Sequence, residues 1–503
     1  MFKKVLIVNR GEIAVRIIKA CQELGIKTVA IYSDVDKNTP HVLLADETIP
    51  LGDPTPIESY LNIPKIIEIA EEAGAEAIHP GYGFLAENPD FAETCSKRGI
   101  TFIGPKAEVI GLMGDKIAAK KTMEKAGVPV IPGYHGNKQD VDSLVKEGEE
   151  IGFPLLVKAA AGGGGKGMRI VDNIDSLAEA IESAKRESKS SFGDDTVFLE
   201  KYLDKPRHIE FQILADHHGN TIHLFERECS IQRRHQKIIE ETPSPVMNPK
   251  LREKMGEAAI RAAEAVGYTN AGTIEFMVDG KLNFYFMEMN TRLQVEHPIT
   301  EMTTGVDLVK WQLKIASGQK LTLKQKDLIQ RGHAIECRIY AEDPSNGFLP
   351  SVGTLKKVEE PSGPNIRVDS GISPNLKITP YYDPLLSKLV VLAENREEAI
   401  QKMIWALSHY IVLGVTTNIS FLKKVLAHEE FKRGNITTHF IDTYFKEYLQ
   451  MKHGLPLDAI IALAVYDAMH LRKQEVVRYK EADPHSPWRY VGRWRVGGEI
   501  DVH

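Results

Sequence analysis

A run of four glycines between lysines is the segment with the clearest chemical meaning. Lys158 is followed by AAAGGGGKGM at residues 159–168. Glycines adopt positive φ readily, and their unhindered N–H groups can surround phosphate oxygens. With Lys166 inside the run and Lys116 upstream, the segment predicts a flexible lid over a polyphosphate. The alternative is a plain flexible turn.

Two common nucleotide-binding motifs do not fit this chain. In the P-loop pattern GxxxxGK[ST], Gly162 and Gly167 have the right spacing, but Met168 stands where lysine is required. A dinucleotide fold would need GxGxxG after the first strand, where Gly11 stands alone. A polyphosphate site therefore needs another architecture.

Two glutamates and an asparagine form a second group. Glu275 and Glu288 lie in two apolar stretches, 274–278 and 283–288, that predict a hairpin turned at DGK, and Asn290 follows. Mg²⁺ prefers carboxylate and amide oxygens, and carboxylates among phenylalanines are costly to bury without a cation. The group predicts a metal site. The alternative is solvated carboxylates on an exposed sheet face.

The run NTRLQVEHP at residues 290–298 carries the third group. Arg292, Gln294 and Glu296 stand at alternate positions, so in an extended segment they would point to one face. Arginine offers a planar fork for a small oxyanion such as bicarbonate, glutamine a neutral donor, and glutamate a base. The alternative is a wet strand face.

The elements that must position these groups begin with alternating strands and helices. Apolar runs predict strands, and apolar residues at helical spacing predict helices between them. This order implies a parallel sheet with right-handed crossovers. The predicted elements are a strand at 5–8, a helix that ends by Gly25, a strand at 28–32, a helix at 63–72, and strands at 77–79 and 101–103.

Two further regions follow the parallel sheet. A helix at 116–126 leads through a proline- and glycine-rich linker into strands. Around Gly332 a third region begins, which ends in helices that reach about Leu449. The predicted strands are 154–158, 197–199, 209–214 and 221–226 in the second region, and 333–340 and 388–392 in the third.

Composition bounds the function classes. The formal charge of −6 over 503 residues lacks the basic excess of a nucleic-acid binder. Four well-separated cysteines without a CxxC pair predict reduced core cysteines in a cytoplasmic protein. The first residues have too short an apolar run for a signal peptide, and the most apolar late stretch, 459–465, is too short to cross a bilayer. We therefore expect no nucleic acid and no membrane.

With these segments in one order, the chain resembles the biotin carboxylases, members of the ATP-grasp ligases, from about Phe2 to Tyr448. Together the shared segments are highly specific, although any one alone would not be. They are VNRGEIAVRI at 8–17, HPGYGFLAEN at 79–88, the glycine run, EKYL at 200–203, PRHIEFQ at 206–212, ECSIQRRHQKIIEE at 228–241, EMNTRLQVEHP at 288–298 and GHAIECRIYAEDP at 332–344.

The resemblance implies an α/β, three-domain ATP-grasp architecture. Residues 1–114 would form an N-terminal parallel-sheet domain that precedes the ATP-grasp domain. Residues 115–330 would form the ATP-grasp domain, with a mobile glycine-rich lid subdomain at about 130–204. Residues 331–448 would form a C-terminal α+β domain, and residues 449–503 an extension.

The resemblance also implies site residues. The ATP phosphates, ribose and adenine would meet Lys116, Lys158, Gly164, Gly165, His208, Glu200, Lys201, Leu203, Gln232 and His235, and Lys166 flanks the glycines. The metal, Mg²⁺ or Mn²⁺, would be held by Glu275, Glu288 and Asn290. Bicarbonate would meet Lys237, Arg292, Gln294 and Val295, with Glu296 as general base. Arg338 would stabilise the biotin enolate.

The implied reaction phosphorylates bicarbonate with ATP to carboxyphosphate, which breaks down so that deprotonated biotin captures the CO₂.

Two departures from the family pattern stand out. Ala161 precedes the glycines where many relatives carry glycine, which affects the opening of the lid. Met451 to His453 reads MKH, not MKM, so we expect biotin on a separate carrier protein. We also expect a homodimer, and a carboxyltransferase subunit is the other expected partner.

Several alternatives stay open from sequence. The tail carries an apolar helical stretch at 457–471 and two tryptophans near arginines. Tryptophans with arginines favour an interface, here with a transferase. The alternative is a tail that packs on its own domain. Another ATP-grasp ligase, such as a purine-pathway carboxylase or a carbamoyl phosphate synthetase half, would also carry these motifs, although the latter is normally duplicated. An inactive nucleotide-binding scaffold is a third reading. The sequence does not identify the final carboxyl acceptor.

Overall fold

The computed structural model describes residues 1–159, 168–233, 236–450, 460–466 and 468–469. The chain divides into two units, Met1–Leu449 and Gln450–His503. In the second unit residues 460–466 are helical, and apolar side chains such as Leu463 and Tyr466 are exposed. Among the described residues, none of the helices is both long and apolar enough to cross a membrane.

The first unit opens with the predicted parallel sheet. Its strand order is β3-β2-β1-β4-β5, and all neighbours run parallel. The helix α1 (Gly11–Glu23) follows the first strand and buries its apolar face, and α3 (Ile63–Glu72) is capped by the side chain of Asn62. The strands are β1 (Lys4–Ile7), β2 (Lys27–Ser33), β3 (Glu47–Gly52), β4 (Ala77–His79) and β5 (Thr101–Phe102).

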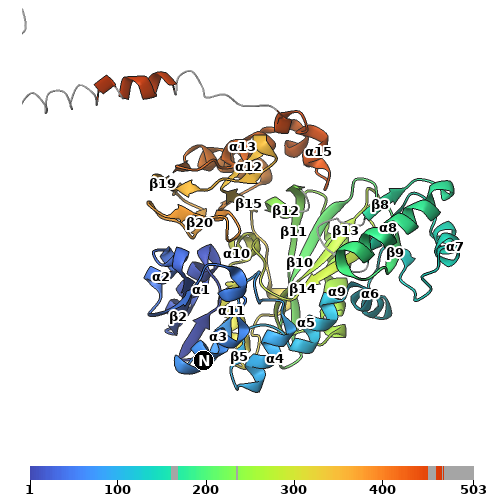
Figure 1. Cartoon of the computed structure of the whole chain (residues 1–503), viewed down its shortest axis with the longest axis horizontal. Helices are drawn as coiled ribbons and strands as arrows, with labels where there is room; N and C mark the ends of the chain where they lie inside the picture. The colour runs from blue at the N-terminus through green and yellow to red at the C-terminus, as the bar shows by residue number, and fades with distance from the viewer. Residues whose placement is uncertain (160–167, 234–235, 451–459, 467, 470–503) are drawn as a thin grey trace, which may run out of the picture. The chain divides into compact units, whose positions relative to one another are not determined.

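An eight-stranded antiparallel sheet forms the centre of the unit (Figure 1). Its order is β14-β13-β10-β11-β12-β15-β22-β20, so strands from both sides of residue 331 belong to one sheet. The predicted hairpin is confirmed as the pair β13 and β14. The strands are β10 (Arg207–Ala215), β11 (Thr221–Arg233), β12 (Gln236–Thr242), β13 (Asn270–Val278), β14 (Phe284–Asn290), β15 (His333–Tyr340), β20 (Ile366–Ser370) and β22 (Leu385–Ala393).

Helices cover the sheet and close its cores. The helix α9 (Pro249–Ala265) packs Met255 and Ala259 against Ile209, Phe211 and Phe276 of the sheet. At the other end, α12 (Arg396–Ser408) and α13 (Ile419–Ala427) cover β15 and β22. The helices α5 (Ala107–Gly114) and α6 (Lys116–Lys125) follow the parallel sheet; α4 (Pro89–Lys97) lies between β4 and β5, and α10 (His297–Thr304) and α11 (Leu308–Ala316) lie between β14 and β15. The four cysteines are buried and free, as predicted.

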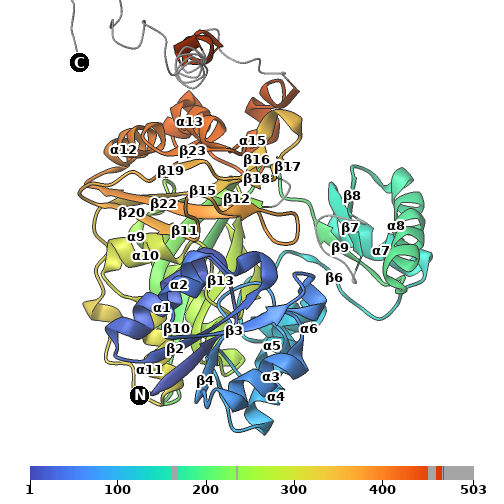
Figure 2. The ribbon, with the colours of Figure 1, turned by 60° about the vertical axis from the view of Figure 1, so that its left-hand side comes forward.

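A small antiparallel sheet with its own core stands to one side of the first unit (Figure 2). Its order is β6-β9-β7-β8, and two helices pack on it. Val197–Lys201 thus pairs with Leu155–Ala159, in a different sheet from Arg207–Ala215. The elements are β6 (Gly133–Tyr134), α7 (Val141–Ile151), β7 (Leu155–Ala159), β8 (Met168–Val171), α8 (Leu177–Phe192) and β9 (Val197–Lys201).

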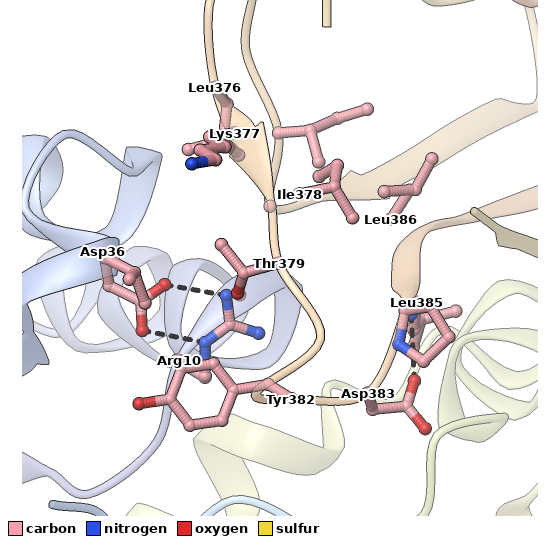
Figure 3. A pocket seen from close by; sticks show the side chains of 15 residues that line it. Arg10, Asp36, Leu376, Lys377, Ile378, Thr379, Tyr382, Asp383, Leu385 and Leu386 are labelled. Atoms are coloured by element: carbon pink, nitrogen blue, oxygen red, sulfur yellow. Dashed lines mark hydrogen bonds and ion pairs between the residues drawn. The ribbon is translucent and has the colours of Figure 1, made fainter. Parts of the chain in front are cut away.

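A partly buried ion pair beside the parallel sheet contacts a loop of the third region (Figure 3). Arg10 binds Asp36 through two hydrogen bonds, and its guanidinium lies 4.5 Å from the centre of the Tyr382 ring. The Tyr382 hydroxyl in turn donates to Ser33 Oγ at 2.8 Å. The cavity beside this contact, about 30 Å³, has room for roughly one water and is lined by none of the predicted site residues.

Gly371 lines the same cavity, where the backbone of the third region packs closely against the start of α1. A Cβ at this position would lie 2.4 Å from the backbone nitrogen of Glu12 and 2.6 Å from the carbonyl carbon of Gly11. Gly371→Ala should therefore overpack the contact and lower the free energy of unfolding by about 1–3 kcal/mol, measured by urea denaturation. Gly280→Ala, where a Cβ meets nothing within 4 Å, is the matched control and should stay within about 0.5 kcal/mol. Equal stability of the two variants would contradict the packing argument.

Candidate active site

Four charged residues stand side by side across four neighbouring strands of the large sheet. Glu288 of β14 is opposite Glu275 of β13, Glu275 is opposite Glu210 of β10, and Glu210 is opposite Arg227 of β11. Side chains opposite one another on adjacent strands share a face, with Cβ atoms about 4.5–5.5 Å apart. Glu275 is only 3% exposed, so the alternative of solvated carboxylates is wrong for this residue.

The ammonium group of Lys237, on β12, joins three carboxylates. Its Nζ lies 2.6 Å from Glu210 Oε2, 2.7 Å from Glu275 Oε1 and 2.7 Å from Glu296 Oε1. Burial opposes the charge of Lys237, but the three carboxylates raise its pKa well above the ordinary value. Lys237 is therefore protonated and holds the cluster together.

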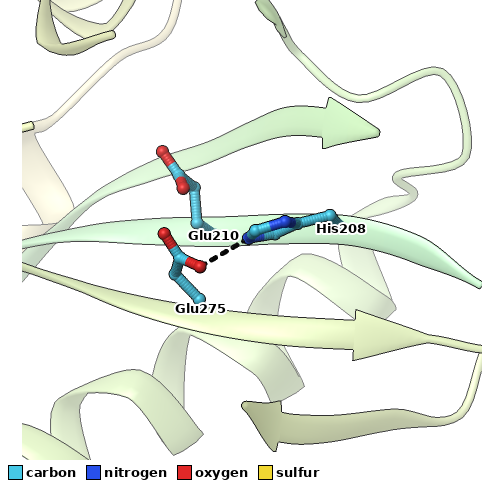
Figure 4. A group of neighbouring side chains, drawn as sticks. All are labelled: His208, Glu210 and Glu275. Atoms are coloured by element: carbon cyan, nitrogen blue, oxygen red, sulfur yellow. Dashed lines mark ion pairs between the residues drawn. The ribbon is translucent and has the colours of Figure 1, made fainter. Parts of the chain in front are cut away.

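His208 supplies a second contact to Glu275. Its Nε2 lies 2.7 Å from Glu275 Oε2, and Figure 4 shows His208, Glu210 and Glu275 converging from β10 and β13. Burial alone would raise the pKa of Glu275, but Lys237 and His208 lower it well below the ordinary value. Glu210 shows the opposite result, because burial and the charges of Glu296 and Glu275 raise its pKa despite Lys237 and Arg227.

The predicted metal ligands lie together. Glu288 is opposite Glu275, and Asn290 Nδ2 donates to Glu275 Oε1 at 2.9 Å. Burial and the charge of Glu275 raise the pKa of Glu288 despite the nearby His208, Lys237 and Lys116. Two carboxylates and an amide oxygen suit Mg²⁺ or Mn²⁺, so the residues fit the ion. Asn290 Oδ1 accepts one hydrogen bond, from Arg292 Nη2, which leaves its second lone pair for a cation.

The segment 291–296 differs from prediction. We expected an extended stretch with three side chains on one face, and this is wrong: the chain bends and turns into α10, with Pro298 in the first turn. His297 Nδ1 lies 2.8 Å from the carbonyl oxygen of Gln294, which stabilises the turn. Gln294 and Glu296 are 2% and 1% exposed, so the alternative of a wet strand face is also wrong.

The predicted bicarbonate residues do not all face the carboxylate cluster. Gln294 donates to Glu275 Oε1 at 2.7 Å and accepts from Arg227 Nη2 at 2.7 Å, so it faces the cluster. Arg292 instead donates to Glu87 Oε2 at 2.7 Å and to Asn290 Oδ1 at 2.8 Å. The carbonyl of Val295 accepts from Lys388 Nζ at 2.9 Å.

Arg338, on β15, connects the cluster to the third region. Its Nε donates to Glu240 Oε1 at 2.6 Å, and its Nη2 donates to Glu296 Oε2 at 3.1 Å. Burial would raise the pKa of Glu296, but Lys237, Arg338 and Arg227 lower it below the ordinary range. Glu296 is therefore an ionised carboxylate between two cations.

The predicted nucleotide residues on the small sheet form a separate group. Glu200, 1% exposed, binds the ammonium groups of both Lys158 and Lys120. Lys116, the first residue of α6, acts through its charge on both Lys158 and Glu288, so it is within electrostatic reach of both groups.

The remaining predicted nucleotide residues divide between other contacts and undescribed positions. Lys201 donates to the Phe153 carbonyl at 2.9 Å, Leu203 is half-buried, and Gln232 donates to the Cys229 carbonyl at 3.4 Å. Gly164, Gly165, Lys166 and His235 lie outside the described residues.

Several residues of these clusters were missed from sequence, among them Lys120, Glu210, Arg227 and Glu240. Lys120 carried a signal, since it follows Lys116 by one helical turn. Glu210 also carried one, because it alternates with His208 on a strand and must share its face. Glu240 carried none, because it stands in the run IIEE, where nothing marks which glutamate turns toward Arg338.

The charges at this site suit the transfer of a group from one anion to another. Buried cations surround an ionised carboxylate, Glu296, that can accept a proton. A hard-cation site lies beside it, and lysines for phosphate oxygens lie beyond. Such a site can stabilise the charge of a transferring phosphoryl group.

Family models match almost the whole first unit. They are the biotin carboxylase N-terminal domain at residues 1–110, the carbamoyl-phosphate synthase L chain ATP-binding domain at 115–324, and the biotin carboxylase C-terminal domain at 336–443.

Relatives and solved structures agree with these matches. A pyruvate carboxylase subunit of Methanothermobacter thermautotrophicus is 57% identical over 88% of this chain and 90% of its own. The mitochondrial alpha subunit of methylcrotonoyl-CoA carboxylase from Dictyostelium discoideum is 50% identical over 99% of this chain and 71% of its own. The biotin carboxylase domain of Hydrogenobacter thermophilus 2-oxoglutarate carboxylase, solved as a dimer with MgADP, ADP and bicarbonate, is 50% identical with a TM-score of 0.84, over 90% of this chain and 100% of that one. This chain, with its parallel N-terminal sheet and carboxylate-lined central sheet, therefore belongs to the biotin carboxylase family of ATP-grasp ligases.

Proposed function

We propose that this chain carboxylates biotin on a separate carrier protein, using ATP, Mg²⁺ or Mn²⁺, and bicarbonate, through carboxyphosphate. One observation carries the proposal: Glu296 binds Lys237 on one side and Arg338 on the other. The base is thus shared between a cluster suited to bicarbonate and phosphate and the arginine suited to a biotin anion.

The nucleotide would lie between the small sheet and the large one. Glu200, with Lys201 and Leu203 after it, would meet the adenine, and Lys116, Lys158 and His208 would meet the phosphates. Lys116 supports this placement, because its charge reaches both Lys158 and Glu288. We also assign Gly164, Gly165, Lys166, Gln232 and His235 to the nucleotide by their motifs.

The divalent cation would be held by Glu275, Glu288 and Asn290. When bound, it would neutralise the phosphate oxygens of the nucleotide and the paired carboxylates. His208 and Lys237 keep Glu275 ionised, so this ligand is ready for a cation.

Bicarbonate would bind beside Lys237, Arg292, Gln294 and the backbone of Val295. Glu296 would take the bicarbonate proton as an oxygen of the anion attacks the γ-phosphorus and ADP leaves. Lys237 and Arg338 now lower the pKa of Glu296. If these cations turn toward bound anions, Glu296 loses part of its stabilisation and becomes a stronger base. Substrate binding would therefore activate the base.

Arg338 would then stabilise the second anion. Carboxyphosphate gives CO₂ and phosphate, the phosphate would take the proton of the biotin ureido N–H, and the deprotonated nitrogen forms the new bond to CO₂. The negative charge on the ureido oxygen needs a preorganised cation. Arg338 is 7% exposed and held by two glutamates, which fixes its direction.

Partners follow from the same assignment. We propose two partners, a biotin carboxyl carrier protein and a carboxyltransferase subunit, together with a homodimer, the state named for the Hydrogenobacter structure. The relatives are named for pyruvate, methylcrotonoyl-CoA and 2-oxoglutarate carboxylases, so several final acceptors stay open. Since the Dictyostelium relative matches 99% of this chain, we propose the tail as a contact with a transferase. The boundaries at 114, 330 and 448, and the lid at 130–204, stay predictions.

The proposed activity predicts that ATP hydrolysis depends on bicarbonate. Purified protein with Mg²⁺ should release ADP faster when bicarbonate is added, and faster still with free biotin. Coupled measurement of ADP release tests this, with bicarbonate-free buffer as the control. Indifference of the rate to both compounds would reject the proposal.

Arg338→Ala should separate the two half-reactions. Loss of a preorganised cation should lower carboxylation of free biotin about 100-fold or more, and lower biotin-independent ATP turnover much less. Arg252→Ala is the matched control, because Arg252 pairs with the buried Glu226 elsewhere on the sheet. Equal loss of both activities in Arg338→Ala would contradict the role of this arginine.

Lys237→Met should destabilise the protein in a pH-dependent way. Removing the ammonium leaves buried carboxylates unpaired and should cost about 3–5 kcal/mol at neutral pH. In the wild type, the lowered pKa values of Glu275 and Glu296 give stability that is present above about pH 4.3, the ordinary glutamate pKa, and is lost as pH falls further. In the variant, burial without the ammonium group raises the pKa values of Glu275 and Glu296. Their ionisation then costs free energy, so the free energy of unfolding of the variant falls as pH rises.

The difference between Lys237→Met and wild type should therefore be largest at pH 7 and above and shrink toward acid, as measured by urea denaturation across pH. Lys310→Met, which breaks a surface pair with Glu23, should change stability by less than about 1 kcal/mol at every pH. A difference that does not depend on pH would show that Lys237 does not balance these carboxylates.

A further inference from the structure

Two buried glutamates, Glu336 and Glu240, lie beside Arg338. Glu336 precedes Arg338 by two positions on β15, so both side chains lie on one face of the sheet. Glu240 of β12 is directly opposite Glu336. Both glutamates are 0% exposed. Two carboxyl groups are thus buried next to each other, beside the arginine.

If Glu336 and Glu240 were both ionised, three of their four carboxylate oxygens would have no hydrogen-bond donor among the described residues. Glu240 Oε1 accepts from Arg338 Nε at 2.6 Å, but Glu240 Oε2 has no hydrogen-bond partner in the described chain. Neither oxygen of Glu336 has a partner among those residues. A buried carboxylate without a donor is so costly that it takes up a proton instead. A proton on Glu336 would have the free Oε2 of the facing Glu240 as its acceptor.

The charges around Glu336 leave this proton in place. From β22, Lys388 faces the pair, but its Nζ is bound to the Val295 carbonyl at 2.9 Å and to Glu12 Oε2 at 3.1 Å. Glu240 and Arg338 face it from β12 and β15, and Glu296 from the loop before α10. Burial, with the charges of Glu240 and Glu296, raises the pKa of Glu336 well above the ordinary value despite Lys388 and Arg338. Burial raises the pKa of Glu240 only to about 7, because Arg338 and Lys237 oppose it, so the proton lies on Glu336.

The neighbouring helix adds no positive charge at this point. α10 packs on this part of the sheet through Ile299, which contacts Ala334 and Val390. Its buried His297 has a pKa well below the ordinary value, because of burial and nearby cations, so it is neutral. Among the described groups, Lys388 and Arg338 are thus the cations that act on Glu336 most strongly, and both are bound to other acceptors.

We propose that Glu336 is a positioning residue for the biotin half-reaction: as a neutral carboxylic acid it donates a hydrogen bond to Glu240 and so fixes the carboxylate that holds Arg338. The proposal rests on the proposed role of Arg338. The proton also limits the negative charge at the arginine. If Glu336 were ionised along with Glu240 and Glu296, three carboxylates would surround Arg338 and weaken its attraction for a biotin anion.

Three variants test the hydrogen bond. Glu336→Leu removes the donor at similar volume and should lower the kcat for carboxylation of free biotin about tenfold, the effect of one lost hydrogen bond to a charged group. Biotin-independent, bicarbonate-dependent ATP turnover should change about twofold or less. Glu336→Gln retains a neutral donor and should rescue most of the loss. Glu226→Gln, on the same sheet but bound to Arg252, is the control for altering a buried glutamate.

A pH profile separates the proton from mere packing. Because the pKa of Glu336 is raised, wild-type Glu336 is neutral at pH 7 and loses its proton as pH rises through that pKa, so biotin carboxylation should fall on the alkaline side. Glu336→Gln cannot lose this proton. The ratio of variant to wild-type rate should therefore increase with pH. Infrared difference spectra at neutral pH should show the C=O stretch of a protonated carboxyl group in wild type, and Glu336→Gln should lack it.

Each outcome decides the matter. The proposal is overturned if Glu336→Gln is as impaired as Glu336→Leu, if both activities fall in parallel with thermal stability, or if the infrared band is the same in wild type and Glu336→Gln. If Glu336→Leu does not fold, the pH ratio and the infrared band of Glu336→Gln give the answer. Wild-type protein without bicarbonate-dependent ATP hydrolysis would reject the proposed function instead, and the infrared band would still show whether Glu336 holds a proton.

Discussion

Like charges buried together are the constraint on which the rest of the site depends. Glu210, Glu275 and Glu296 reach one ammonium group, that of Lys237, at 2.6–2.7 Å. Carboxylates removed from water repel one another strongly, and only closely placed cations and donors make their ionised forms stable. Arg227, His208 and Arg338 therefore surround the same group. The balance leaves Glu296 and Glu275 ionised, the state that a base and a metal ligand both need.

The large sheet produces this arrangement through register. Glu288, Glu275, Glu210 and Arg227 stand in one row because each is paired directly with the next across β14, β13, β10 and β11, although the β13–β14 register shifts just after Glu275. The same sheet continues from β12 to β15, so Lys237 and Arg338 stand on adjacent strands. The parallel N-terminal sheet contributes Glu87, from the loop after β4, which holds Arg292.

Local patterns predicted local structure well. The alternation of strands and helices in the first hundred residues and the hairpin that pairs Glu275 with Glu288 are both confirmed. The extended segment at Arg292 to Glu296 is not, because Pro298 and the turn at His297 begin a helix there, and alternate spacing carries no information about such a bend. The motif resemblance selected Lys237, Glu275 and Glu296, but it selected neither Glu210 nor the contacts among the four.

Those contacts could not be predicted because they depend on strand register and on competition between charges. Glu240 turns toward Arg338 and Glu241 toward His333 and Arg396, although the two are neighbours in sequence. Glu200 likewise gathers Lys120 and Lys158 from two different elements. Only the three-dimensional pairing of strands decides which carboxylate meets which cation.

The pairing of β12 with β15 also bears on the fate of the CO₂ unit. Adjacent strands lie about 4.8 Å apart, so the strand that carries Lys237 and the strand that carries Arg338 form one stiff platform rather than two bodies that must meet. Under the proposed reaction, a small uncharged molecule released at the first has only about the width of a strand to cross before capture at the second. Escape into bulk water is the competing path, and such a short passage leaves it little time.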